Sequence, residues 1–179
     1  DKLRHLKIFE AKERFVDELI DSGLNYTIIR PNGFFSDMRD FLDMAKKGKI
    51  YLFGNGEFKL NPIHGQDLAK ICIDKISSNN KEFTVGGPDL LTHNELAKLA
   101  LNAWDKNTRI THLPDWIRKL TIWSFRTFTS SKTYGPIEFF LTLMAFDNEA
   151  EQLGNHHLVD FFKEEVEKEK IKNSERQNN

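Results

Sequence analysis

Apolar residues recur with a helical period at the start of the chain, and a strand-like apolar run follows directly. The pattern predicts an amphipathic helix over residues 3–22, ended by Gly23, with one apolar stripe made of Ile8, Phe9, Phe15, Val16, Leu19 and Ile20. Lys12 falls near the middle of this stripe, where burying a charge is costly without a partner. Residues 25–31 then predict a buried strand that leads into a short loop. A core-facing lysine beside such a loop suggests a ligand site.

The remaining sequence alternates short strands and helices. Further strands are expected at 49–53, 58–60, 81–85 and 108–113, the first two forming a hairpin around the turn 54–56. Further helices are expected at 36–47, 65–77, 92–104, 114–128, 137–146 and 154–172. Thr92 and Glu95 form a capping box that opens one of these helices. Tyr134-Gly135-Pro136 is expected to interrupt the helical pattern.

Composition limits the protein classes. The 179 residues carry a net charge of −1, which argues against a general nucleic-acid binder. The single cysteine, Cys72, excludes an intramolecular disulfide and is consistent with a reducing compartment. A cytoplasmic location is expected. Its place between two isoleucines in a helical pattern predicts a buried, inert thiol. No apolar run reaches the length of a membrane span.

Three segments together resemble one known family. They are KERFVDELIDSGLNYTIIRPNGF at 12–34, NPIHGQDLA at 61–69 and VGGPDLLTHNELA at 85–97. In this order and spacing they resemble an atypical short-chain dehydrogenase/reductase of the NmrA-like NAD(P)-binding group. The resemblance implies an α/β fold: the C-terminal part of a Rossmann-like fold with a helical substrate-binding region.

The glycine-rich turn that holds the dinucleotide in such folds has no counterpart in this sequence. The chain also begins with Asp, so we expect it to be the C-terminal part of a longer protein that lacks about 100 residues here. Residues 1–113 are expected to form the second half of the nucleotide-binding domain, 114–172 a helical substrate or lid region, and 173–179 a disordered tail.

The resemblance assigns roles to individual residues. The implied cofactor-binding residues are Lys12, Pro31, Asn32 and Gly33, with NADP or NAD as the cofactor. The implied substrate-binding residues are Phe34, Phe35 and Trp116. Lys12 is also the implied catalytic lysine, which contacts the nicotinamide ribose. The family's proton-donating tyrosine would stand four residues earlier, where this chain has Ile8.

Several of these residues have plainer interpretations. Lys12 can be a lysine that extends from the edge of an apolar face, and the loop 31–35 can be an ordinary turn with buried aromatics. For His64 and Asp67 a structural role is favoured over catalysis. The six histidines are scattered and no metal-binding pattern is expected. The stripe of the helix 114–128, with basic residues at its sides, suits core or lid packing, a partner surface or a membrane interface.

The sequence therefore predicts an NAD(P)-dependent oxidoreductase that acts on an apolar small molecule, represented here by a part that lacks the dinucleotide loop and is expected to be inactive alone. The alternative is a non-catalytic NAD(P)-binding redox sensor or assembly protein, which the loss of the tyrosine would permit. Expected partners are a small-molecule substrate and no nucleic acid; a protein partner and a peripheral membrane contact stay open. The substrate, the choice between NAD and NADP, and the oligomeric state are not determined.

Overall fold

The computed structural model describes residues 6–177. The helices are α1 (Lys7–Asp21), the 3-10 helix η1 (Phe35–Met38), α2 (Arg39–Lys46), α3 (Gly65–Lys75), α4 (His93–Ala103), α5 (Asp115–Phe128), α6 (Ser131–Leu143) and α7 (Leu158–Gln177). The strands are β1 (Thr27–Pro31), β2 (Ile50–Phe53), β3 (Lys59–Leu60), β4 (Lys81–Gly86), β5 (Leu91–Thr92), β6 (Ile110–Leu113) and β7 (Glu151–Gln152).

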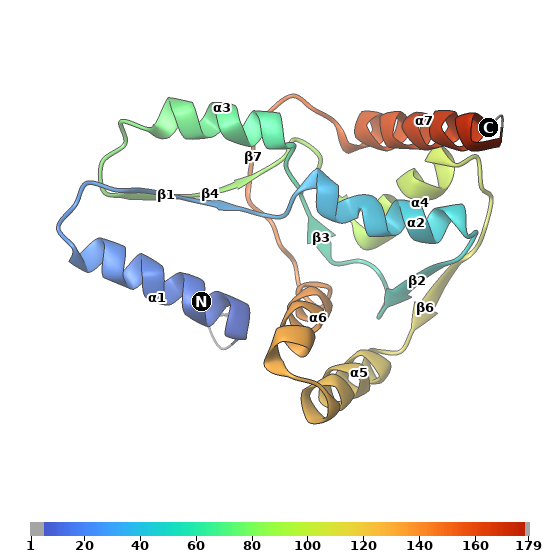
Figure 1. Ribbon diagram of the computed structural model, residues 1–179, viewed down its shortest axis with the longest axis horizontal. Helices are drawn as coiled ribbons and strands as arrows, with labels where there is room; N and C mark the ends of the chain where they lie inside the picture. The colour runs from blue at the N-terminus through green and yellow to red at the C-terminus, as the bar shows by residue number, and fades with distance from the viewer. Residues whose placement is uncertain (1–5, 178–179) are drawn as a thin grey trace.

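The main sheet is parallel, with strand order β1-β4-β7. Thr27 pairs with Lys81 and Pro31 with Val85, so β1 and β4 end together. Helix α1 lies on one side of this sheet and α3 on the other (Figure 1). The α/β class that the sequence predicts is therefore confirmed. In such sheets the carboxyl ends of the strands are where ligands bind.

Most of the buried apolar side chains lie outside this sheet. The larger core joins α2, α4, α7 and β2, and its fully buried members include Phe41, Leu96 and Phe162. A second, smaller cluster lies against the main sheet and is made of Ile63, Ile71 and Val85. The helical half of the molecule thus holds the greater part of the hydrophobic stabilisation.

Three predictions of secondary structure are wrong. Strands β2 and β3 form no hairpin, because β2 pairs in parallel with β6 and β3 pairs with β5. The intervening turn instead contacts the start of α4, where Asn94 N–H donates to the Gly56 carbonyl at 3.0 Å.

Helix α6 runs through Pro136, which lies in its second turn, so packing against α5 and α1 offsets one missing hydrogen bond. Helix α7 continues through Gln177, where a disordered tail was expected, and residues 178–179 lie outside the described part.

The capping box at the start of α4 is confirmed. The Thr92 hydroxyl accepts from Glu95 N–H at 3.1 Å, and the Glu95 carboxylate accepts from Thr92 N–H at 2.8 Å. Cys72, by contrast, is exposed rather than buried. The reason is that α3 turns only part of its apolar face toward the sheet, which leaves Ile73 and Ile76 exposed as well.

A buried asparagine joins the segments at the carboxyl end of the sheet. Asn61 is 0% exposed, and its side-chain oxygen accepts from the Asn32 amide at 2.6 Å and from Ala150 N–H at 3.0 Å. Its side-chain nitrogen donates to the carbonyls of Gly87, at 3.2 Å, and Ala150, at 2.9 Å. A Cβ on Gly86 would overlap this side chain, so glycine is required there.

We expect Asn61→Ala to lower the free energy of unfolding by about 3 kcal/mol, because it leaves buried polar groups of three segments unpaired. Urea unfolding followed by circular dichroism measures this change. Asn102→Ala is the matched control, since Asn102 is exposed on α4 and should alter stability by no more than about 0.5 kcal/mol. Equal stability of the two variants would contradict the structural role of Asn61.

Candidate nucleotide site at the carboxyl end of the sheet

The loop 31–35 leaves β1 at the carboxyl end of the parallel pair. Asn32 N–H donates to the Val85 carbonyl at 2.9 Å, and the Gly33 carbonyl accepts from Ile63 N–H at 2.9 Å. Gly33 has a φ of +98°, which favours glycine, and a Cβ there would meet no atom within 4 Å. The loop backbone is therefore held firmly at both ends and open at its tip, which suits close approach by a ligand.

The two phenylalanines of this loop differ in their surroundings. Phe35 is 2% exposed and packs in the larger core, with its ring centroid 5.5 Å from those of His64 and Phe161. Phe34 is half-buried and packs against the smaller cluster at the sheet. Phe35 is thus committed to the core, and a substrate contact by either ring stays a prediction.

Asn32 also has a structural task. Its side-chain nitrogen donates to the Asn61 side chain and to the Asn148 carbonyl, so both of its N–H groups are used. A contact of Asn32 with a cofactor would therefore have to use its side-chain oxygen.

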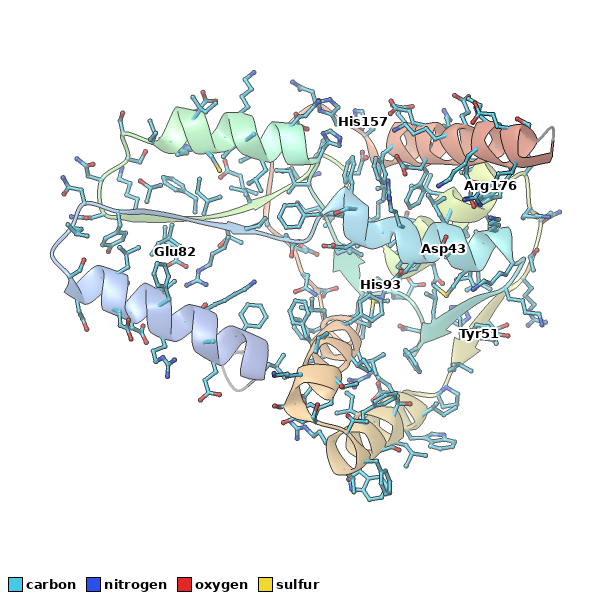
Figure 2. All side chains as sticks on the ribbon, in the orientation of Figure 1. Asp43, Tyr51, Glu82, His93, His157 and Arg176 are labelled. Atoms are coloured by element: carbon cyan, nitrogen blue, oxygen red, sulfur yellow. The ribbon has the colours of Figure 1, made fainter. Side chains whose placement is uncertain are left out.

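The expectation that Lys12 faces the core is wrong. Lys12 is exposed, and the adjacent Glu13 occupies the buried position, at 5% exposed. Arg30, in β1, forms a bidentate ion pair with Glu13, with its Nη2 2.9 Å from Glu13 Oε2, and also pairs with Glu82. Glu82 projects from the sheet toward α1 (Figure 2). The Glu13–Arg30 pair sets the rotation of α1 and so turns Lys12 outward.

Sequence reasoning missed this pair, although a charged residue inside the β-branched run 27–31 was a signal for it. The hydrogen bonds with Glu13 hold the pKa of Arg30 above its usual value. Removing one partner would leave the buried Glu13 carboxylate unpaired, which is strongly destabilising. The pair is best understood as the attachment of α1 to the sheet.

His64 and Asp67 have the structural roles that the sequence favoured. Asp67 Oδ2 accepts from the backbone N–H groups of Asn155 and His156, both at 3.0 Å, and Asp67 Oδ1 lies 2.9 Å from the His156 ring. The His64 and His156 rings stack with centroids 4.2 Å apart. Burial opposes ionisation of Asp67, but these hydrogen bonds outweigh it, so the pKa of Asp67 lies below its usual range.

A second carboxylate holds the start of α7. Asp89 accepts from Leu158 N–H at 2.8 Å and from the His157 ring at 2.7 Å, which raises the pKa of His157 above its usual value. His156 and His157 therefore bind different carboxylates, which tie α3 and the loop after β4 to the start of α7. Figure 2 shows His157 at this junction.

His93, at the start of α4, was not singled out from the sequence. It is 2% exposed, and its Nδ1 has no hydrogen-bond partner in the described part of the chain. Burial lowers its pKa to about 4, so the ring is neutral at pH 7. Its burial follows from the packing of α4 and could not be predicted from the sequence.

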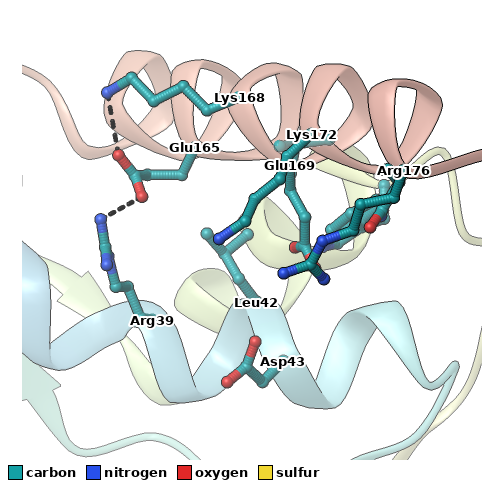
Figure 3. Close-up of a pocket in the computed structure, with 11 residues that line it drawn as sticks. Arg39, Leu42, Asp43, Glu165, Lys168, Glu169, Lys172 and Arg176 are labelled. Carbon is teal, nitrogen blue, oxygen red and sulfur yellow. Dashed lines mark hydrogen bonds and ion pairs between the residues drawn. The ribbon is translucent and has the colours of Figure 1, made fainter. Parts of the chain in front are cut away.

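Two surface grooves lie away from the loop 31–35. One, of about 370 Å³, lies between α2 and α7, where Arg39 pairs with Glu165 and Glu165 with Lys168 (Figure 3). Its charged lining contains none of the residues predicted from the sequence. The other, of about 490 Å³, lies between β1 and α3 and includes Ile29, Cys72 and Ile76.

Trp116 lies on α5 and is 62% exposed, so it is not packed in the core. Its contact with substrate stays a prediction. Among residues 6–177, no helix is both long and apolar enough to cross a membrane, and no three His, Cys, Asp or Glu side chains are grouped as metal ligands would be.

The Asp67 contacts predict a pH dependence of stability. Because the pKa of Asp67 is lowered on folding, its contribution is complete above the ordinary aspartate pKa of about 4 and is lost as the pH falls through the lower, folded-state pKa. We expect Asp67→Asn to be less stable than the wild type at pH 6, with the difference shrinking toward pH 3. Urea unfolding at a series of pH values measures both curves, and a difference independent of pH would contradict the assignment.

No family model matches the sequence. The chain is similar to the divinyl chlorophyllide a 8-vinyl-reductases of Cucumis sativus (37% identity over 46% of this chain and 22% of the relative) and Oryza sativa (31% over 66% and 32%). It is also similar to NADH dehydrogenase [ubiquinone] 1 alpha subcomplex subunit 9 of Arabidopsis thaliana (27% over 63% and 30%). The chain thus spans about a third or less of the length of these relatives. Their names describe chloroplastic and mitochondrial proteins, and a cytoplasmic location for this chain stays a prediction.

Solved structures show the same fold. The NADPH-dependent quinone oxidoreductase QOR2 of Escherichia coli matches 90% of this chain and 59% of its own, with a TM-score of 0.62 and 15% identity. A nucleoside-diphosphate-sugar epimerase of Staphylococcus aureus matches 87% and 57%, with a TM-score of 0.60 and 18% identity. The fold is Rossmann-like. The similarity to these sequence relatives agrees with the resemblance of the chain to the atypical short-chain dehydrogenases/reductases of the NmrA-like group.

Proposed function

We propose that the chain is part of an NAD(P)-dependent reductase and that the nicotinamide end of the cofactor lies over the carboxyl ends of β1 and β4. The observation that carries this proposal is the loop 31–35, which is anchored on both sides and open at Gly33 where these two strands end together. Relatives named as a vinyl-reductase, and a fold shared with an NADPH-dependent oxidoreductase, support the same reaction class.

The residues present fit a dinucleotide in two respects. Lys12 is exposed and has no ion-pair partner within residues 6–177, so its ammonium is available to a ribose or phosphate oxygen. Gly33 offers backbone that no side chain covers. When bound, the reduced nicotinamide supplies the hydride. In this proposal Lys12 orients the ribose, and Pro31 and Gly33 border the nicotinamide.

The edge of β1 supports a larger nucleotide fold. Within the described residues β1 pairs only with β4, so its other edge is open. The helices on both sides of it expose apolar side chains: Phe15, Ile20, Leu24, Ile73 and Ile76. We infer that a further parallel strand, with its helices, pairs with this edge and brings the pyrophosphate-binding turn to the site.

A second candidate is a non-catalytic NAD(P)-binding protein. Ile8 stands where the family's tyrosine would donate a proton, and an aliphatic side chain cannot do so. One relative is named as a subunit of NADH dehydrogenase, which fits a structural role in a complex. Cofactor binding without turnover of any carbonyl or alkene substrate would favour this candidate. Under the reductase proposal the proton comes from water, from the substrate or from a residue outside this chain.

The test is a thermal-shift and calorimetric titration of NADPH and NADH against the full natural protein. We expect saturable binding, which Lys12→Ala weakens about tenfold because a charge-assisted hydrogen bond to the ribose is lost. Arg14→Ala is the control, since Arg14 is exposed on the same helix. An unchanged Kd in Lys12→Ala would remove the ribose role, and no binding of either cofactor would overturn the proposal.

A further inference from the structure

Helix α5 presents an apolar stripe that nothing in the described chain covers. Trp116, Leu120 and Trp123 are 62%, 50% and 59% exposed, and Phe128, at the end of the helix, is 76% exposed. At about 100° per residue the first three lie within about 60° of one another on the helix surface. Figure 1 shows α5 at the periphery of the molecule, and Figure 2 shows aromatic rings projecting outward from it.

The other side of α5 is held against α6 by a hydrogen bond and an ion pair, so the helix cannot rotate to bury the stripe without breaking them. Arg118 is 8% exposed, and its guanidinium donates to Asp115 at 2.6 Å and to the Leu141 carbonyl of α6 at 3.3 Å. Arg126 pairs with Glu138 of α6, whose side chain is buried. These contacts hold α5 and α6 together as a pair, with the tryptophans turned away from it.

The charge of this helix pair differs from that of the whole chain. Residues 115–144 contain four basic and two acidic residues, a net charge of +2, whereas the chain carries −1. Both acidic residues are in ion pairs, Asp115 with Arg118 and Lys119, and Glu138 with Arg126. Lys132 has no ion-pair partner in the described part of the chain. The helix pair therefore keeps a net positive charge, and both of its own carboxylates are already paired.

We propose that α5 docks on an anionic lipid surface, with its axis in the plane of the interface and its tryptophans at the level of the headgroups. Tryptophan suits this position because its ring is apolar and its N–H is polar, and the basic residues at the flanks attract lipid phosphates. A basic amphipathic helix with outward aromatics is the sequence type that binds such surfaces. This proposal concerns a surface separate from the cofactor site and does not depend on cofactor binding.

The experiment is flotation of the full natural protein with vesicles of phosphatidylcholine alone and of phosphatidylcholine mixed with phosphatidylglycerol. We expect flotation with the anionic vesicles only, weakened by salt because the attraction is screened, and a blue shift of tryptophan emission. The double variant Trp116→Ser/Trp123→Ser should partition at least about tenfold less, since it loses most of the apolar area. Lys119→Gln/Lys132→Gln should weaken binding to the anionic vesicles.

The matched control is Ile171→Ser, which removes an apolar side chain of α7 that is 59% exposed and lies outside both the stripe and the open edge of β1, and it should float like the wild type. Circular dichroism verifies that each variant keeps its fold, as expected for exposed positions. Absence of flotation, or equal flotation of the tryptophan variant, would overturn the proposal. Self-association of the wild type that the tryptophan variant abolishes, without any vesicle binding, would assign the stripe to a protein contact and also overturn it.

Discussion

The side-chain amide of Asn61 is the interaction on which the arrangement of this chain depends. It bonds to the loop after β1, to the end of β4 and to the segment before β7, which are distant in sequence. Because it has no exposure to water, each of these bonds replaces hydration that is lost on folding. The geometry of the candidate nucleotide site, set by the loop 31–35, is therefore a consequence of this buried amide.

Local signals made most elements predictable. The capping box at Thr92 and Glu95 depends on residues three apart, and its geometry follows from the sequence alone. Strand pairing is not local: Ile50 finds its partner at Ile110, far along the chain, so a nearby glycine turn gave the wrong hairpin. The predicted interruption of the helix at Pro136 is wrong for a similar reason. Contacts of α6 with α5 and α1 outweigh the helix-breaking preference of proline.

The place of the candidate site was predictable, but its side-chain detail was not. A loop after a buried strand marks the ligand end of an α/β sheet, and the structure puts Pro31–Phe35 there. The rotation of α1 could not be read from its apolar pattern, because the Glu13–Arg30 pair determines it and not burial of the stripe. Aromatic character alone does not distinguish a pocket wall from a core, so the packing of Phe35 in the larger core was not predicted, and its contact with substrate stays a prediction.

The unequal division of the core has a consequence for motion. The α2–α4–α7 cluster is large and continuous, whereas the cluster against the sheet has three buried apolar residues, supplemented by ion pairs such as Glu13–Arg30. Regions with few buried contacts open at lower free energy than the rest of a molecule. Backbone amides of β1 and β4 should thus exchange with solvent deuterium through partial opening, while those of α4 exchange only when the whole chain unfolds. The parallel pair beside the candidate site should therefore open at lower free energy than the α2–α4–α7 core.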